Sequence, residues 1–108
     1  MPVYKVKDKT TTNLRSVKNW LNKEKTAAEF EPYGQPDKII KLTEGQKVEV
    51  AGPGKGTAVY GTYDPVTKKP VDMNKVFYLV TGIKGTNAPA LVKGVDLYVY
   101  AEDVEYVP

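Results

Sequence analysis

Within residues 46–50, polar and apolar side chains alternate from Lys47 to Val50. Because successive side chains of an extended strand point to opposite faces, this pattern places Val48 and Val50 on one face and Lys47 and Glu49 on the other. We expect the valines to face a core and the charged side chains to face water. A chain with this period-two pattern is constrained to build a half-buried β-sheet.

Strand signals recur along most of the chain. The other predicted strands are residues 3–7, 38–42, 57–63, 75–81, 95–100 and 104–107. Residues 75–81 are apolar on both faces, which predicts a central strand that is covered on both sides. Residues 43–45 are expected to form a turn, and residues 64–74 an exposed excursion. These signals predict a mainly β protein with a small barrel of five to six strands, in a single domain over residues 1–108.

Two ribbons are expected to carry the core, residues 38–50 and residues 95–107. We expect them to be adjacent in one curled sheet, with their apolar sides meeting in a single interior. On residues 95–100 the alternation places Val95, Leu97 and Val99 on the core face.

One region has a helical pattern. Leu14, Val17 and Leu21 recur at helical spacing, and Asn13 is a suitable N-cap. Residues 26–29 have the spacing of a capping box, and Pro32 must end any helix. We therefore predict a short helical insertion, one helix or two pieces, at about 14–30.

The stretch AGPGKGTAVYG, residues 51–61, resembles a phosphate-binding loop at first sight. A true loop of this kind needs a glycine where Glu49 stands, and it must open a helix whose amides complete the anion site. The residues that follow, Thr57–Tyr63, favour a strand instead. Gly52, Gly54 and Gly56 are therefore expected to serve a turn between strands.

The composition excludes several kinds of catalytic and metal-binding site. The chain contains no histidine and no cysteine, which excludes Ser-His and Cys-His nucleophile pairs and thiolate metal sites. Chemistry by paired carboxylates stays open, but no pair is nominated by the sequence. We expect no enzyme activity and no cofactor. No apolar run has the length of a signal peptide or a membrane helix, so neither membrane insertion nor export by a cleaved signal is expected, if Met1 is the natural start.

Charge is unevenly distributed. The net charge is +3; the first 25 residues are mainly basic, whereas Glu102, Asp103 and Glu105 make the end acidic. Solvated surface is the simpler interpretation, and contact with a partner or between copies is the alternative. The acidic trio lacks the spacing of a calcium loop, so no metal site is predicted. Nucleic acid is not expected as a partner, because the basic excess is small and the chain has a single arginine.

Aromatic side chains are the main candidates for binding, with eight tyrosines, two phenylalanines and one tryptophan. Tyr98 and Tyr100 share the non-core face of their strand, and Tyr60 and Tyr63 lie on opposite faces of another. Tyrosine offers a large contact area with a polar tip, which suits an interface. The alternative is ordinary strand tyrosines half-covered by loops. Trp20 is either the edge of a buried helix face or an exposed anchor.

Four pieces of the chain carry a family pattern in order. Asn13-Leu14-Arg15 matches an N-[VL]-R opening, residues 39–50 two strands around a short turn, residues 76–80 an aromatic strand, and residues 98–106 a closing strand, a 3₁₀ turn and a last strand. Together they resemble bacterial SH3-like (SH3b-type) domains. The sequence departs from that pattern in the charged insertion after Arg15, in the long connection over residues 52–74 and at Leu97, where a glycine is usual.

The resemblance implies a non-catalytic role, either binding of cell-wall peptides or a structural role in phage particles. We expect a structural or interaction protein in a larger assembly, in its most concrete form a phage virion accessory or decoration protein. It would bind a protein partner or assemble with itself, in a virion or in the cytoplasm. The alternative is an SH3-like module that binds cell-wall peptide or a protein partner.

Overall fold

The computed structural model describes residues 2–33, 40–51, 57–85, 88–89, 91 and 94–108. For residues 62–63 and 70–73 it describes the backbone alone. The glycines at positions 52, 54 and 56 lie outside this part of the chain, so the turn predicted for them is not described. The residues after them form a strand, as predicted.

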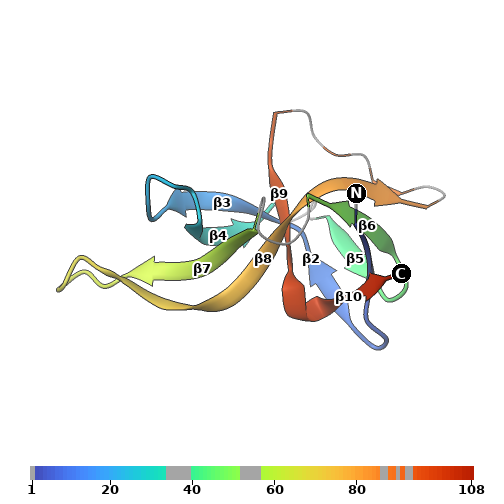
Figure 1. Cartoon of the computed structure of the whole chain (residues 1–108), viewed down its shortest axis with the longest axis horizontal. Coiled ribbons are helices and arrows are strands. Elements are labelled where there is room, and N and C mark those ends of the chain that lie inside the picture. The colour runs from blue at the N-terminus through green and yellow to red at the C-terminus, as the bar shows by residue number, and fades with distance from the viewer. Residues whose placement is uncertain (1, 34–39, 52–56, 86–87, 90, 92–93) are drawn as a thin grey trace.

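The described part of the chain is built mainly from strands (Figure 1). They are β1 (Val3–Val6), β2 (Thr11–Asn13), β3 (Arg15–Trp20), β4 (Ala27–Pro32), β5 (Lys41–Thr43), β6 (Lys47–Val50), β7 (Thr57–Tyr63), β8 (Pro70–Lys84), β9 (Leu97–Tyr100) and β10 (Val104–Val107), with one 3₁₀ turn, η1 (Ala101–Asp103). The mainly β prediction is confirmed, with more strands than the five to six expected.

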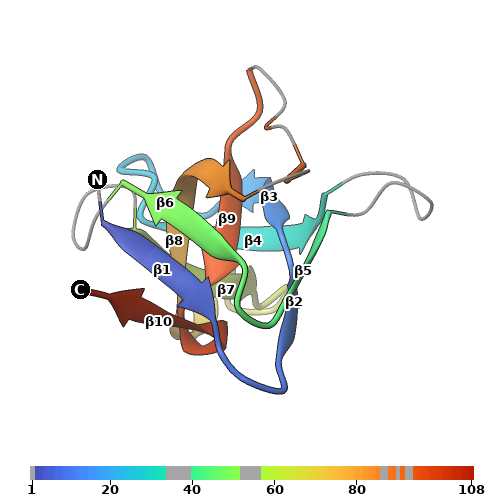
Figure 2. The ribbon, with the colours of Figure 1, turned by 90° about the vertical axis from the view of Figure 1, so that its right-hand side faces the viewer.

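The strands form one large sheet and one small one. The large sheet has the order β10-β1-β6-β8-β7-β4-β3-β9, and β9 also pairs with β8. β4 and β7 pair in parallel, and the other pairs are antiparallel. β2 and β5 make the small sheet. The β7–β8 hairpin extends from one end of the molecule, and β1 and β10 lie at the other end (Figures 1 and 2).

β8 is the central strand of the fold. It pairs with β6, β7 and β9 along different parts of its length. Val80 points into one hydrophobic cluster and Phe77 into another, and both are buried. The prediction that residues 75–81 are covered on both faces is therefore confirmed. A strand that lies between two apolar cores needs apolar side chains on both of its faces.

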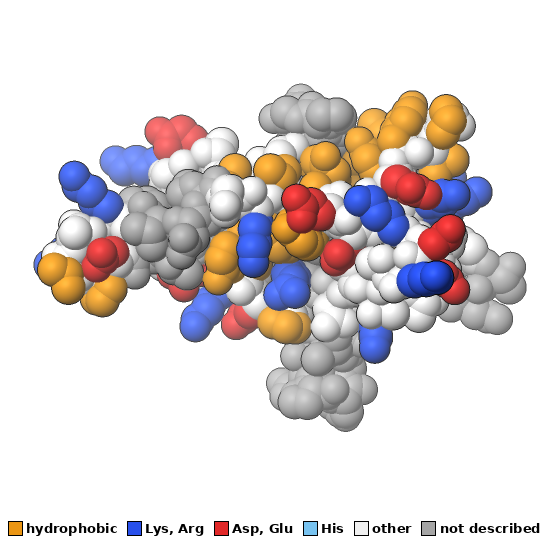
Figure 3. All heavy atoms as spheres, turned by 90° about the horizontal axis from the view of Figure 1, so that it is seen from below, with side chains coloured by type: hydrophobic (Ala, Val, Ile, Leu, Met, Phe, Trp, Pro, Cys, Tyr) orange, Lys and Arg blue, Asp and Glu red, His pale blue; other side chains and the backbone are white. Residues whose placement is uncertain are grey.

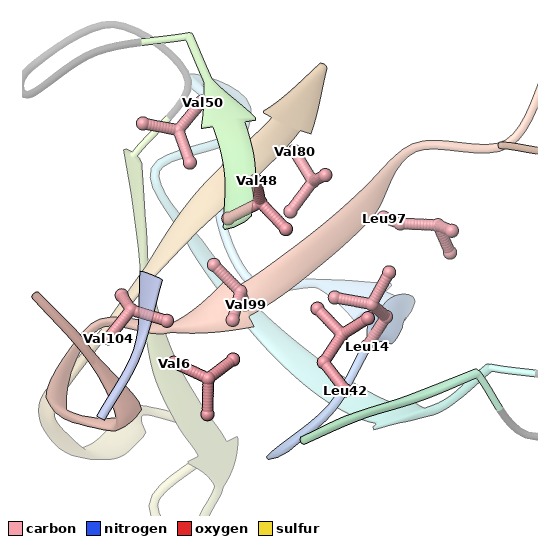
Figure 4. Packing of buried hydrophobic residues seen from close by; sticks show 9 residues of the cluster. All are labelled: Val6, Leu14, Leu42, Val48, Val50, Val80, Leu97, Val99 and Val104. Carbon is pink, nitrogen blue, oxygen red and sulfur yellow. The ribbon is translucent and has the colours of Figure 1, made fainter. Parts of the chain in front are cut away.

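The first cluster is mainly aliphatic and contains the predicted core (Figure 4). Its buried members are Val6, Leu14, Leu42, Val48, Val50, Val80, Leu97, Val99 and Val104. The two predicted ribbons therefore do meet in one interior. They are not neighbours in the sheet, however, because β8 lies between β6 and β9, and β1 lies between β6 and β10.

The second cluster is largely aromatic and lies on the opposite face of β8 and β9. Its buried members are Ala28, Phe30, Ala58, Phe77 and Tyr98. Strands β3, β4 and β7 supply the layer that covers this face, since Phe30 comes from β4 and Ala58 from β7. The alternation along β9 thus serves two cores, with Leu97 and Val99 in the first and Tyr98 in the second.

The predicted helical insertion at about 14–30 is wrong, because this region forms the β3–β4 hairpin. The side chain of Asn22 organises its turn: Oδ1 accepts from the Thr26 amide at 3.0 Å, and Nδ2 donates to Thr26 Oγ1 at 2.7 Å. Local helix propensity is weak, and burial decides the outcome. Leu14 packs in the first cluster and Val17 against the second, so they do not share one helical face.

The predicted exposed excursion over residues 64–74 is confirmed in part: residues 65–69 and 74 are exposed, at the end from which the β7–β8 hairpin extends (Figure 1). A short turn follows β7, and β8 already begins at Pro70. In the turn, Asp64 Oδ1 accepts from the Val66 amide at 2.8 Å. At the tip, Val66 is 87% exposed, and the part that the sequence did not predict is the strand from Pro70 onward. Proline is tolerated as the first residue of a strand, where no ladder hydrogen bond is lost.

The predicted turn at residues 43–45 is confirmed. Its backbone conformation favours glycine at position 45, which can be tested by substitution. Gly45 has a φ of 81°, and the Gln46 amide donates to the Thr43 carbonyl at 3.1 Å. An alanine Cβ would meet no atom within 4 Å, so any cost comes from the backbone conformation. Gly45→Ala should lower the free energy of unfolding by about 1–2 kcal/mol in chemical denaturation.

Gly82→Ala is the matched control for this substitution. Its new Cβ would lie 3.9 Å from Glu49 Cβ, an ordinary contact, and no left-handed φ is required there. We expect the free energy of unfolding to change by less than about 0.5 kcal/mol. Equal losses for the two variants would contradict the left-handed turn.

Candidate functional site

A hollow of about 230 Å³ opens above the second cluster. It is lined by Arg15, Phe30, Tyr60, Lys75, Phe77 and Tyr100, and we call it the aromatic pocket. These residues come from five strands, β3, β4, β7, β8 and β9. A site built on paired strands is held more rigidly than one built on loops.

The register of the strands explains how the lining residues meet. Phe77 lies opposite Tyr100, and Tyr60 lies opposite Lys75. Residues directly opposite each other in a pair of strands place their side chains on the same face, within contact distance. Lys75 and Phe77 are two residues apart on β8 and so share that face.

The floor of the aromatic pocket is made of packed rings. Phe77 is 4% exposed and Phe30 is 8% exposed. Their ring centroids lie 4.3 Å apart in a stacked arrangement, and Tyr100 also stacks with Phe77, at a centroid distance of 5.2 Å. Offset ring pairs at these distances are favourable beyond the area that they bury. The floor is therefore an ordered apolar surface.

Two basic side chains lie over the rings. Arg15 Cζ is 5.9 Å from the centroid of Phe77, and Lys75 Nζ is 5.8 Å from the centroid of Tyr60. Both distances are within the range of cation–π attraction. Neither cation has an ion-pair partner among the side chains that the structure describes, whereas Lys5 and Lys84 do, with Glu105 and Glu49.

Tyr100 connects the aromatic pocket to the acidic end of the chain. Its hydroxyl donates to Glu102 Oε2 at 2.8 Å. This hydrogen bond, together with partial burial, raises the pKa of Tyr100 above its ordinary value. Among the described residues, no group of three or more acidic side chains is close enough to hold a metal ion.

The structure brings together four of the five aromatic residues that the sequence nominates. Tyr60 and Tyr100 line the aromatic pocket, and Tyr98 lies in the second cluster beneath it. Trp20 is half-buried and packs edge-on against Tyr98, with a centroid distance of 6.4 Å. Tyr63 lies at the end of β7 opposite Pro70, and its side chain is outside the described set.

Tyr98 differs from the expectation of a partly wet tyrosine face, because it is 5% exposed. It supports the pocket floor from below, 5.2 Å from Phe30. Sequence reasoning did not nominate Arg15, Phe30, Lys75 or Phe77. Lys75 could have been found from the sequence, because it is two residues from Phe77 and so lies on the same face of a strand. Phe30 could have been found from the alternation of residues 28–32, but the helix prediction obscured that pattern.

Two further hollows lie in the described part of the chain. One of about 410 Å³ is lined by turn residues, with Lys84 already paired to Glu49. Another of about 210 Å³ lies beside Trp20 and Asp96. The aromatic pocket is the better candidate, because it combines a buried apolar floor with basic groups that lack a described ion-pair partner.

Burial of Tyr98 gives a prediction for alkaline pH. Desolvation, with a smaller contribution from Asp96, raises the pKa of Tyr98 above 10.0, its model-peptide value. As the pH rises past about 10, the unfolded chain loses this proton first, so the free energy of unfolding falls. Tyr98→Phe removes this contribution and should make the fall above about pH 10 shallower than in the wild type. Denaturation at several pH values measures it, and identical slopes would contradict it.

Comparison with known proteins adds no relative: no family model, curated protein or solved structure matches the chain. Among the described residues, no helix is long and apolar enough to cross a membrane.

Proposed function

We propose that this chain is a non-enzymatic structural or interaction protein that docks a protein partner at the aromatic pocket, within a larger assembly. The observation that carries the proposal is the pocket itself, an ordered floor of rings under two basic side chains. Buried aromatic anchors surrounded by polar groups are typical of the energetic centre of protein interfaces. The absence of histidine and cysteine from the sequence is in keeping with a binding role.

We further propose that the domain is an SH3-like barrel. The segment that resembles the closing part of that family forms β9, η1 and β10 in sequence order. Strands β1, β6, β8, β9 and β10 all contribute to the first cluster, and each pairs with another of the set. In this view, β3, β4 and β7 are additions that cover the outer face of β8 and β9 and so create the aromatic pocket.

A peptide selection tests the docking function. A random peptide library is selected on the purified chain, and the selected peptides are then measured against Tyr60→Ala. We expect the affinity to fall by about tenfold or more, since truncation of an aromatic anchor at an interface removes that much binding. Tyr106→Ala, a change of the same kind on exposed β10, is the control and should have little effect. Failure to select any peptide, or greater sensitivity to Tyr106→Ala, would contradict the proposal.

The assembly version, a phage accessory or decoration protein, has a separate test. An antibody against the chain is used to follow it through density-gradient fractions of particles released by the organism that encodes it. Banding with the particles supports this version, and recovery only in the soluble fractions contradicts it. Retention on purified sacculi in a parallel pull-down would favour the alternative of a cell-wall-binding module.

A further inference from the structure

The size of the aromatic pocket limits what it can hold. At about 230 Å³ it is smaller than the roughly 300–1,000 Å³ of pockets that bury a whole small molecule. It is large enough for one bulky apolar side chain, stacked on the rings of Phe30 and Phe77. A pocket of this size therefore suits an anchor residue that projects from a peptide.

The charges around the aromatic pocket indicate what should flank that anchor. Arg15 and Lys75 lie above the rings and have no carboxylate partner among the described side chains. Charges left unpaired at the edge of an apolar site select partners of the opposite sign. Figure 3 shows that, on the face it draws, hydrophobic side chains are interspersed with basic and acidic ones.

A single-stranded nucleic acid would also combine stacking with negative charge. The structure favours a peptide, because the pocket offers two basic side chains, whereas nucleic-acid grooves carry a run of them along the backbone path.

We propose that the occupant is a peptide segment of another protein in which one large apolar side chain is flanked by carboxylates. The apolar side chain stacks on Phe30 and Phe77, and the carboxylates meet Arg15 and Lys75. This inference rests on the proposed docking function and names the chemistry of the partner.

The test uses fluorescein-labelled, blocked heptapeptides with a central tryptophan, flanked by aspartates, asparagines or lysines. Anisotropy titrations of the purified chain give each affinity at low and at physiological salt. We expect aspartate flanks to bind about tenfold or more tighter than lysine flanks, with the difference shrinking as salt rises. A central alanine in the aspartate peptide should weaken binding by about tenfold.

Lys75→Glu supplies the charge reversal, because Lys75 is exposed and the contact that it loses is the one with the Tyr60 ring. It should weaken binding of the aspartate peptide by about tenfold and strengthen binding of the lysine peptide. Lys41→Glu, an exposed lysine on β5 outside the pocket with the same change in net charge, should leave both affinities unchanged. Thermal melts of both variants establish that they fold.

The outcomes separate the two proposals. Equal affinity for all flanks, or an unchanged preference in Lys75→Glu, overturns the acidic partner while leaving a docking pocket. Tighter binding of labelled oligothymidylate that is lost in Lys75→Glu assigns the pocket to nucleic acid and overturns the inference. If no peptide binds, and Tyr60→Ala also changes nothing in the library selection, both the acidic partner and the docking function are overturned.

Discussion

Replacing Phe77 with alanine is expected to lower the free energy of unfolding by about 3–5 kcal/mol. Phe77 is 4% exposed and stacks with both Phe30 and Tyr100. Its loss removes apolar burial and leaves a cavity that strand-bound neighbours cannot fill. Chemical denaturation followed by circular dichroism measures the change. For a domain of this size, the loss is a large share of total stability.

Val66→Ala is the control for the Phe77 substitution. Val66 is 87% exposed at the tip of the β7–β8 hairpin, so its truncation should change stability by less than about 0.5 kcal/mol. A Phe77→Ala variant as stable as Val66→Ala would show that the second cluster is not packed.

Leu14→Ala is expected to lower the free energy of unfolding by about 2–5 kcal/mol, because Leu14 belongs to the first cluster. Leu14 is fully buried in the first cluster beside Leu42 (Figure 4). Its backbone is fixed as well: its amide donates to the Ile40 carbonyl at 2.9 Å, and its carbonyl accepts from the Tyr33 amide at 3.0 Å. With the backbone held on both sides, the space left by the side chain cannot close by a local shift.

Leu14→Ile is the matched control, since it keeps the volume and should cost less than about 1.5 kcal/mol. The pair is measured by denaturation under the same conditions. A loss below about 1 kcal/mol for Leu14→Ala would place this side chain outside the core and contradict the path of the chain between β2 and β3.

Period-two alternation predicted the first core well. Val48 and Val50 are buried and Lys47 is exposed, as expected from residues 46–50 alone. The doubly apolar character of residues 75–81 identified the central strand, because only a strand between two cores gains from apolar side chains on both faces.

Local patterns failed where a long-range contact decides the structure. Leu14, Val17 and Leu21 have helical spacing, yet this segment gains more by pairing with β4 and burying Phe30 against Phe77. The partner surface lies more than forty residues away in sequence, so no local signal contains it. The aromatic pocket was missed for the same reason: its floor exists only once β4 lies over β8.

The central claim is that the β3–β4 hairpin packs on the outer face of β8 and β9 and so builds the aromatic pocket. Nuclear Overhauser effects between aromatic side chains measure this directly. The account predicts cross-peaks between the ring protons of Phe30 and Phe77, whose centroids are 4.3 Å apart, and between Trp20 and Tyr98. Sequential amide cross-peaks typical of a helix over residues 14–30, without the Phe30–Phe77 contact, would contradict it.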